Sequence, residues 1–376
     1  MKKSVLALAA LSALAGVAHA QSSVSLYGRV DLAFSKRSGY QNQGINDTQS
    51  SRVGFKGVED LGGGLKAIFN IEAGLSPDDG TQADTSRFFN RRAVVGLQSD
   101  SLGTLTLGRE YTPTFLLTEK PADPWGTDGF AAYEAIVRGG VGSTTDTGVL
   151  GGPSTTNHCG AATCTDTNNT SSAAIDQKRT NNAITYNLSV AGFNVGAQLG
   201  EKETNGTASP YKNQLSLAAS YGAGPFYVGV GYDAPGTLPK ADKKPYWVSL
   251  VGTYDFGFLK AFGFYGTGHN AHVQAGSNEG DKVRSWLVGA SVPVAAGQLR
   301  IAYGELKNKT VDDLNLSGTG ADGKVQEQTS VGYHYPLSKR TTIYTDVVYD
   351  SKAGYALNAT NGKSKTGYDV GIKHEF

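Results

Sequence analysis

Segments in which apolar and polar side chains alternate recur along the chain. In residues 214–221 the apolar side chains take every second position: Leu215, Leu217, Ala219 and Tyr221. Residues 328–335 and the C-terminal segment that ends at Phe376 follow the same rule. A period of two indicates a β-strand with one apolar and one polar face. The sequence therefore predicts strands that separate an apolar environment from a wet one.

The connections between these segments alternate in length. Seven short turns are expected, at 59–63, 99–103, 191–192, 222–224, 255–258, 295–297 and 336–339. Eight longer polar loops lie between and after them, at about 37–49, 76–86, 112–178, 201–211, 234–243, 271–281, 309–323 and 351–365. Fifteen connections join sixteen strands. An even number of strands, with short turns at one end and long loops at the other, is typical of a transmembrane β-barrel.

Composition agrees with such a barrel. Charged residues make up 18% of the chain and the 50 glycines are well above average usage, whereas no stretch is long and apolar enough for a membrane helix. Lipid cannot satisfy backbone N–H and C=O groups, so a membrane-spanning sheet has to close on itself. We therefore expect an all-β fold, a sixteen-stranded antiparallel barrel wide enough to enclose water.

Residues 1–20 have the features of a cleaved secretory signal. Two lysines precede an apolar stretch, and Ala18 and Ala20 are small residues at the positions that a signal peptidase reads. Residues 21–376 then form the barrel domain, with 32 basic and 33 acidic residues and a net charge of −1. That balance gives no reason to expect nucleic acid as a partner.

Four blocks of the sequence resemble the general porins of Gram-negative bacteria, in particular the β-proteobacterial branch. They are SLYGRVD at 25–31, SRVGFKGVEDLGGGLKAIFNIEAG at 51–74, RRAVVGL at 91–97 and GTLTLGREYTP at 103–113. The C-terminal strand that ends at Phe376 completes the resemblance, which extends over essentially the whole mature chain.

The resemblance implies a barrel in the cell outer membrane, embedded in lipid and lipopolysaccharide and assembled as a homotrimer. It also implies passive diffusion of small hydrophilic solutes and ions through a water-filled channel, without a cofactor or catalysis. In this family the third loop, here at about 112–178, folds inward to narrow the pore. The terminal aromatic residue, here Phe376, is the signal read by the barrel assembly machinery.

In this family basic residues of the wall face acidic residues of the third loop. The basic candidates are Arg29, Arg52, Arg91, Arg92, Arg138 and Arg179, and the acidic candidates are Asp123, Asp128 and Glu134. Arg52 shares a strand face with Gly54 and Lys56, so alternation directs it into the lumen. Arg91 and Arg92 are adjacent, so alternation allows only one of them inside; the family favours Arg91, whereas polarity allows either.

The loop tip departs from the enteric porins, because Pro124 stands where a carboxylate would be expected. A weakened acidic side predicts a modest preference for anions.

Two cysteines, Cys159 and Cys164, lie in the second half of the third loop. In an exported protein this spacing favours a local disulfide. A metal site with His158 is the alternative, but no further ligands lie nearby in the sequence.

Other functions leave specific signs that the sequence lacks. A hydrolase needs a nucleophile and a base within reach of each other, and none of the five mature histidines stands in such a pattern. A soluble β-sandwich or adhesin has no need of the many Tyr and Phe residues at strand ends. A plugged barrel remains an alternative that single-channel conductance would separate from an open one.

Overall fold

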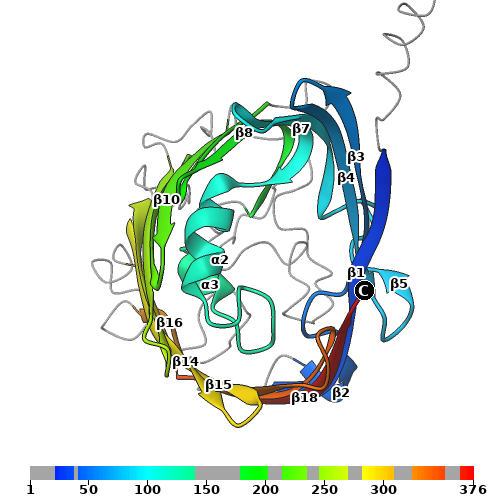
Figure 1. The fold of residues 1–376 in the computed structure, drawn as a ribbon. Coiled ribbons are helices and arrows are strands. Elements are labelled where there is room, and N and C mark those ends of the chain that lie inside the picture. The colour runs from blue at the N-terminus through cyan, green and yellow to red at the C-terminus, as the bar shows by residue number, and fades with distance from the viewer. Residues whose placement is uncertain are drawn as a thin grey trace, which may run out of the picture.

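A closed antiparallel barrel forms the wall of the molecule in the computed structural model (Figure 1). The structure describes residues 22–37, 41–139, 178–201, 214–234, 245–269, 282–308, 324–351 and 365–376. Within these ranges no helix is both long and apolar enough to cross a membrane.

Sixteen strands make the wall, each paired with its neighbours in the ring. They are β1 (Ser23–Arg37), β3 (Arg52–Gly62), β4 (Leu65–Ser76), β6 (Arg92–Ser99), β7 (Gly103–Tyr111), β8 (Arg179–Val190), β9 (Phe193–Gly200), β10 (Gln214–Ala223), β11 (Phe226–Ala234), β12 (Tyr246–Asp255), β13 (Lys260–His269), β14 (Lys282–Val294), β15 (Gly297–Asn308), β16 (Lys324–Pro336), β17 (Thr341–Asp350) and β18 (Lys365–Glu375). Two short strands, β2 (Gln41–Asn46) and β5 (Thr81–Gln82), belong to the first two long loops.

The ring closes where the first strand meets the last. β1 pairs with β18 from Arg29 opposite Glu375 to Arg37 opposite Gly367, and its other edge pairs with β3 and β2. At the end of the chain, Phe376 and Gly28 exchange two backbone hydrogen bonds of 3.1 Å. The expected sixteen-stranded antiparallel barrel is therefore confirmed.

Alternation along the strands matches the pattern of the sequence. On β10, Leu217 is exposed on the outer face while Ser216 and Ser220 are buried. On β16 and β18, Val331, Val370 and Ile372 point outward, and polar side chains such as Ser330 and Asp369 point inward. The outer face suits hydrocarbon, whereas most of the inner face is polar.

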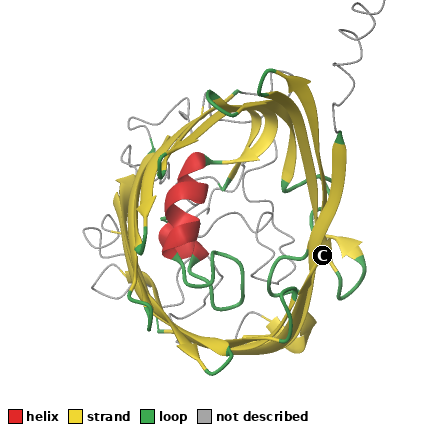
Figure 2. Cartoon of the chain, viewed as in Figure 1, coloured by secondary structure: helices red, strands yellow, loops and turns green. Residues whose placement is uncertain are grey.

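The third long loop enters the barrel directly after β7. It forms a single π-helical turn η1 (Phe115–Glu119) and the short helices α2 (Lys120–Ala122) and α3 (Glu134–Val137), all within the ring of strands (Figure 2). Residues 112–139 thus follow the expected inward course, and residues 140–177 lie outside the described part of the chain.

An apolar core fastens this loop to one side of the wall. It contains loop residues such as Trp125, Tyr133 and Ile136 and inward-facing wall residues of β12, β13, β14, β15 and β17: Trp247, Val251, Phe264, Val283, Leu287, Ala302, Leu306 and Val348. The wall therefore has an apolar inner patch on this side, and the remaining space of the lumen lies toward β1, β3, β4 and β6.

Candidate functional site

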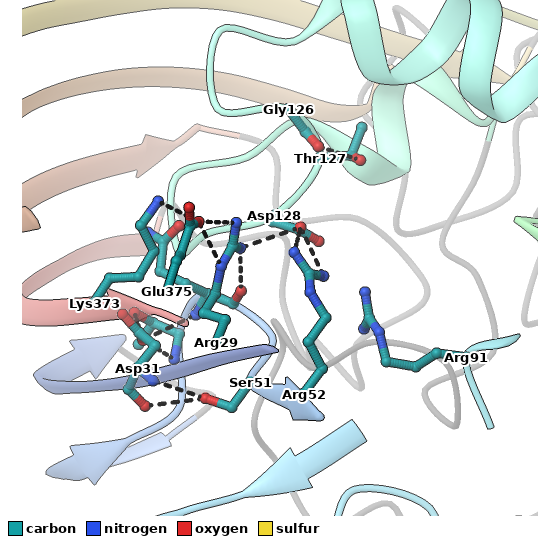
Figure 3. A network of polar contacts seen from close by, with 12 residues as sticks. Arg29, Asp31, Ser51, Arg52, Arg91, Gly126, Thr127, Asp128, Lys373 and Glu375 are labelled. Carbon is teal, nitrogen blue, oxygen red and sulfur yellow. Dashed lines mark hydrogen bonds and ion pairs between the residues drawn. The ribbon is translucent and has the colours of Figure 1, made fainter. Parts of the chain in front are cut away.

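Two arginines from neighbouring strands meet one carboxylate of the inward loop. Arg29 of β1 and Arg52 of β3 are direct register partners, so both side chains emerge on the lumen face at the same height. Both reach Asp128 Oδ2, at 3.4 Å from Arg29 Nη1 and 3.3 Å from Arg52 Nη1 (Figure 3). The inward orientation that alternation predicts for Arg52 is thus the one that the structure has.

Arg29 is held from three sides. Besides Asp128, its guanidinium donates to Glu375 Oε1 at 2.8 Å and to the backbone oxygen of Gln49 at 2.9 Å. Lys373 lies on the other side of Glu375, with its Nζ 3.5 Å from Oε1. Arg29 therefore has little freedom to move along the pore axis.

Asp128 is ionised in this setting. Burial alone would raise the pKa of its carboxyl, but the positive charges of Arg52, Lys178, Arg91 and Arg29 outweigh burial and hold the pKa well below its ordinary value. Its contacts to the arginines are longer than the 2.7–2.9 Å of the tightest charge-assisted hydrogen bonds. The loop thus places a permanent negative charge beside the two arginines without a close bidentate pair.

Asp123 does not face the basic wall, contrary to the sequence-based expectation. Its buried carboxylate accepts backbone N–H groups of Trp125 at 2.9 Å, Thr127 at 3.1 Å and Tyr133 at 2.7 Å. Burial raises its pKa to about 6, although these hydrogen bonds act in the opposite direction. Asp123 closes the loop tip on itself, because a carboxylate next to a turn satisfies nearby N–H groups first.

Arg91 also reaches the lumen, where its Nε donates to Glu72 Oε1 at 2.6 Å and its Nη2 to the Tyr111 hydroxyl at 2.9 Å. Arg92 lies opposite Glu72 in the strand register and forms an ion pair with Glu110. Both arginines therefore come to the side of the wall that carries Glu72. Strict alternation was the wrong guide here, because Arg91 precedes the first residue of β6.

The two ends of the third loop meet in a stacked column of side chains. Arg179 lies over the Tyr111 ring at 4.3 Å, the rings of Tyr111 and Phe115 are stacked at 5.4 Å, and Lys178 lies over Phe115 at 5.0 Å. Arg179 Nη2 also donates to the Tyr111 hydroxyl at 2.8 Å. Arg179 therefore lies at the neck of the loop, where it closes the column.

Glu134 and Arg138 pair with each other and not with the wall arginines. Their side chains are 2.9 Å apart across one turn of α3, and Lys178 Nζ lies 3.1 Å from the same Glu134 oxygen. Of the three acidic candidates only Asp128 contacts the arginines of the wall. Glu134 was assigned to the constriction as an acidic residue of the family's inward loop, which does not show that a helix pairs it locally.

A cavity of about 440 Å³ lies between the loop and this part of the wall. Five basic side chains line it, Arg29, Arg52, Arg91, Lys120 and Lys178, against three acidic ones, Glu72, Asp128 and Glu375. Sequence reasoning missed Glu72, Glu375, Lys120 and Lys178. Glu72 had a usable signal, because it lies on the lumen side of β4 next to the strand that carries Arg52.

Some candidate residues carry no further structural information. Cys159 and Cys164 lie outside the described residues, so the disulfide stays a prediction. Among the residues that the structure describes, no group of three or more His, Cys, Asp or Glu is arranged to hold a metal ion.

The model of the Gram-negative porin family matches residues 7–355 of this chain. The chain belongs to the Gram-negative porins. Outer membrane porin protein 32 of Delftia acidovorans is 30% identical to this porin over the whole length of both chains, and an outer membrane porin protein of Bordetella pertussis is 28% identical, also over both full lengths. The expected β-proteobacterial resemblance is thereby confirmed.

Solved structures agree with this assignment. The anion-selective porin from Comamonas acidovorans superposes with a TM-score of 0.70 at 27% identity, covering 95% of this porin and all of that chain. OmpF of Salmonella typhi shares the fold with a TM-score of 0.65 at 16% identity, over 94% and 97% of the two chains. This porin is therefore an outer-membrane channel for passive diffusion of small hydrophilic solutes.

Proposed function

We propose that this porin is a mildly anion-selective channel whose selectivity is set by Arg29, Arg52 and Arg91 against Asp128. The excess of basic over acidic side chains around the cavity carries this proposal. The field is concentrated there, because low-dielectric walls surround a narrow aqueous path. Arginine keeps its charge at any working pH, so the preference does not depend on a titrating cation.

The net charge of the mature chain is a poor guide to this selectivity. Exposed charges more than about 8–10 Å from the ion path are largely screened at physiological salt. The porin from Comamonas acidovorans, which is 27% identical to this porin, is described as anion-selective. This similarity supports a preference for anions here as well.

Reversal potentials in a salt gradient test the proposal. We expect the wild type to prefer anions, Arg52→Ala to reduce that preference and Asp128→Asn to increase it, because each variant removes one charge from the same contact. Arg87→Ala is the matched control, since its partner Asp84 lies in the second loop and neither residue lines the cavity. A cation-selective wild type, or equal potentials for all four proteins, would contradict the proposal.

The assembly and the absence of catalysis belong to the same proposal. We infer a homotrimer of open barrels that needs no cofactor, seated in outer-membrane lipid and lipopolysaccharide. OmpT of Vibrio cholerae, which shares the fold, has been solved in a trimer form. The test is electrophoresis of unheated and boiled protein, together with bilayer recordings that should show closure in three equal steps. A single step and an unshifted band would contradict the trimer.

Phe376 is proposed as the residue that the barrel assembly machinery reads. The backbone of Phe376 already pairs with Gly28 and closes the barrel. Recognition by the assembly machinery would then depend on the aromatic side chain, separately from closure. Phe376→Ala should lower the amount of barrel in the outer membrane, while the protein refolded in detergent keeps its thermal stability. Normal levels in cells would count against this role.

A further inference from the structure

The chain has three tryptophans, and the indole N–H of two of them joins the inward loop to the wall. Trp125, in the loop, donates to Asp346 Oδ1 of β17 at 2.8 Å. Trp247, in β12, donates to the backbone oxygen of Val137 at 3.3 Å. The third, Trp286, donates to Glu305 at 3.1 Å, a bond between two neighbouring wall strands. Trp125 and Trp247 therefore tie the loop to the wall, whereas the bond of Trp286 lies within the wall and serves as a comparison.

The bond of Trp125 is fully enclosed. The Trp125 side chain is 5% exposed, and Asp346 is completely buried. The same carboxylate accepts a hydrogen bond from His334 of β16 at 3.1 Å, so Asp346 is fixed from the wall side before the loop reaches it. A buried carboxylate with a fixed orientation is a rigid attachment point.

A short, strongly bent segment connects this attachment to Asp128. Only Gly126 and Thr127 lie between, with φ of 69° and 62°. Asp123 accepts the backbone N–H groups of both Trp125 and Thr127, which holds the bend. A displacement of Trp125 therefore moves Asp128, because the turn between them is short and is held by these hydrogen bonds.

The following part of the loop is held separately. Gln328 donates to the backbone oxygens of Ala131 and Ala132, both at 3.1 Å, and the Tyr133 hydroxyl donates to the backbone oxygen of Ala302. Asp128 lies between this region and Trp125. On the pore side it accepts hydrogen bonds of 3.3–3.4 Å from Arg29 and Arg52, which are longer than the tightest charge-assisted contacts and leave room for the loop to set the distance.

We propose that Trp125 is a positioning residue for ion selectivity: its bond to Asp346 sets how closely Asp128 approaches Arg29 and Arg52. This inference rests on the proposed selectivity function and adds a residue that does not line the cavity. When the bond is removed, the loop tip loses its attachment to the wall and gains freedom, so the average distance of Asp128 from the arginines increases and Asp128 neutralises them less. The preference for anions then rises.

The test is a double-mutant cycle read by reversal potential. Trp125→Phe removes the donor and keeps a ring, and it should shift selectivity toward anions, by less than Asp128→Asn does. In the Asp128→Asn background the same substitution should cause no further shift, because the charge that it positions is gone. Trp286→Phe is the matched control, which removes an indole N–H from the wall and should leave selectivity unchanged.

An isosteric replacement covers the case in which Trp125→Phe fails to assemble. Benzothienylalanine at position 125 has sulfur in place of the indole N–H and keeps the ring shape, so it should give the same shift. If Asp128→Asn changes selectivity and neither change at position 125 does, the inference is wrong and the proposed function stands. Equal shifts from Trp125→Phe with and without Asp128 would also overturn the inference. If Asp128→Asn itself has no effect, the proposed function fails first.

Discussion

Arg29 of the first strand and Glu375 of the last strand are direct register partners, and their side chains are 2.8 Å apart. The seam that closes the barrel therefore also supplies one of the basic residues of the pore and its carboxylate partner. Closure of the ring and the charge distribution of the lumen depend on the same pair of strands.

We expect Glu375→Gln to change selectivity more than stability. The substitution removes a negative charge beside Arg29 and should raise the preference for anions. Because the Glu375 side chain is 46% exposed, its ion pair contributes at most about 1 kcal/mol to the free energy of unfolding. The measurement is a reversal potential with a thermal unfolding curve. Asp100→Asn, which removes the partner of Lys66 at a turn, is the control and should shift neither.

Arg91 and Arg92 should differ in their effects. Arg91→Gln removes a charge from the cavity and leaves buried Glu72 without its arginine partner, so selectivity should move toward cations and unfolding should become easier by about 3 kcal/mol. Arg92→Gln is the control, because Arg92 pairs with Glu110 and does not line the cavity. Identical reversal potentials for the two variants would contradict this distinction.

Selectivity due to Asp128 should persist in acid. The folded-state pKa of Asp128 lies below its ordinary value of 3.8, so the stabilising contact is present above that value and is lost only as the pH falls toward the lower, folded-state pKa. At pH 4 the difference in reversal potential between wild type and Asp128→Asn should therefore equal the difference at pH 7. If the difference at pH 4 falls to roughly 60% of its value at pH 7, Asp128 has an ordinary pKa.

Gly139 should not tolerate a side chain. Its φ is 70°, and an added Cβ would lie 2.6 Å from Cζ3 of Trp247. Gly139→Ala should destabilise the loop by about 1–3 kcal/mol, seen as faster proteolysis of the loop in detergent. Gly80→Ala has a similar φ of 77° with open space around the Cβ, so it separates backbone strain from the clash with Trp247.

The predicted disulfide is tested by mass spectrometry of unreduced peptides. We expect Cys159 and Cys164 to be joined to each other, because a secreted protein meets an oxidising environment and the spacing closes a small loop. Two free thiols would remove this prediction without affecting the barrel.

The strands and turns were predictable because one face of each strand meets lipid. Alternation correctly placed Arg52 in the lumen for that reason. It failed for the pair Arg91 and Arg92, because Arg91 lies just before a strand. Asp123 was assigned as an acidic residue of the third loop, without help from alternation, and its carboxylate is used by its own turn. Contacts between distant segments, such as that between Trp125 and Asp346, leave no periodic signal in the sequence at all.

The apolar inner patch also limits which parts of this porin can be exchanged with a relative. Trp247, Leu287 and Val348 face the lumen as fully buried residues only because the inward loop covers them. A third loop without matching apolar side chains would leave this patch exposed to water, and this loop placed in a barrel with a polar wall would lose its apolar contacts. The loop and this side of the wall therefore match each other, and a chimaera should take β12 to β17 and residues 112–139 from the same porin.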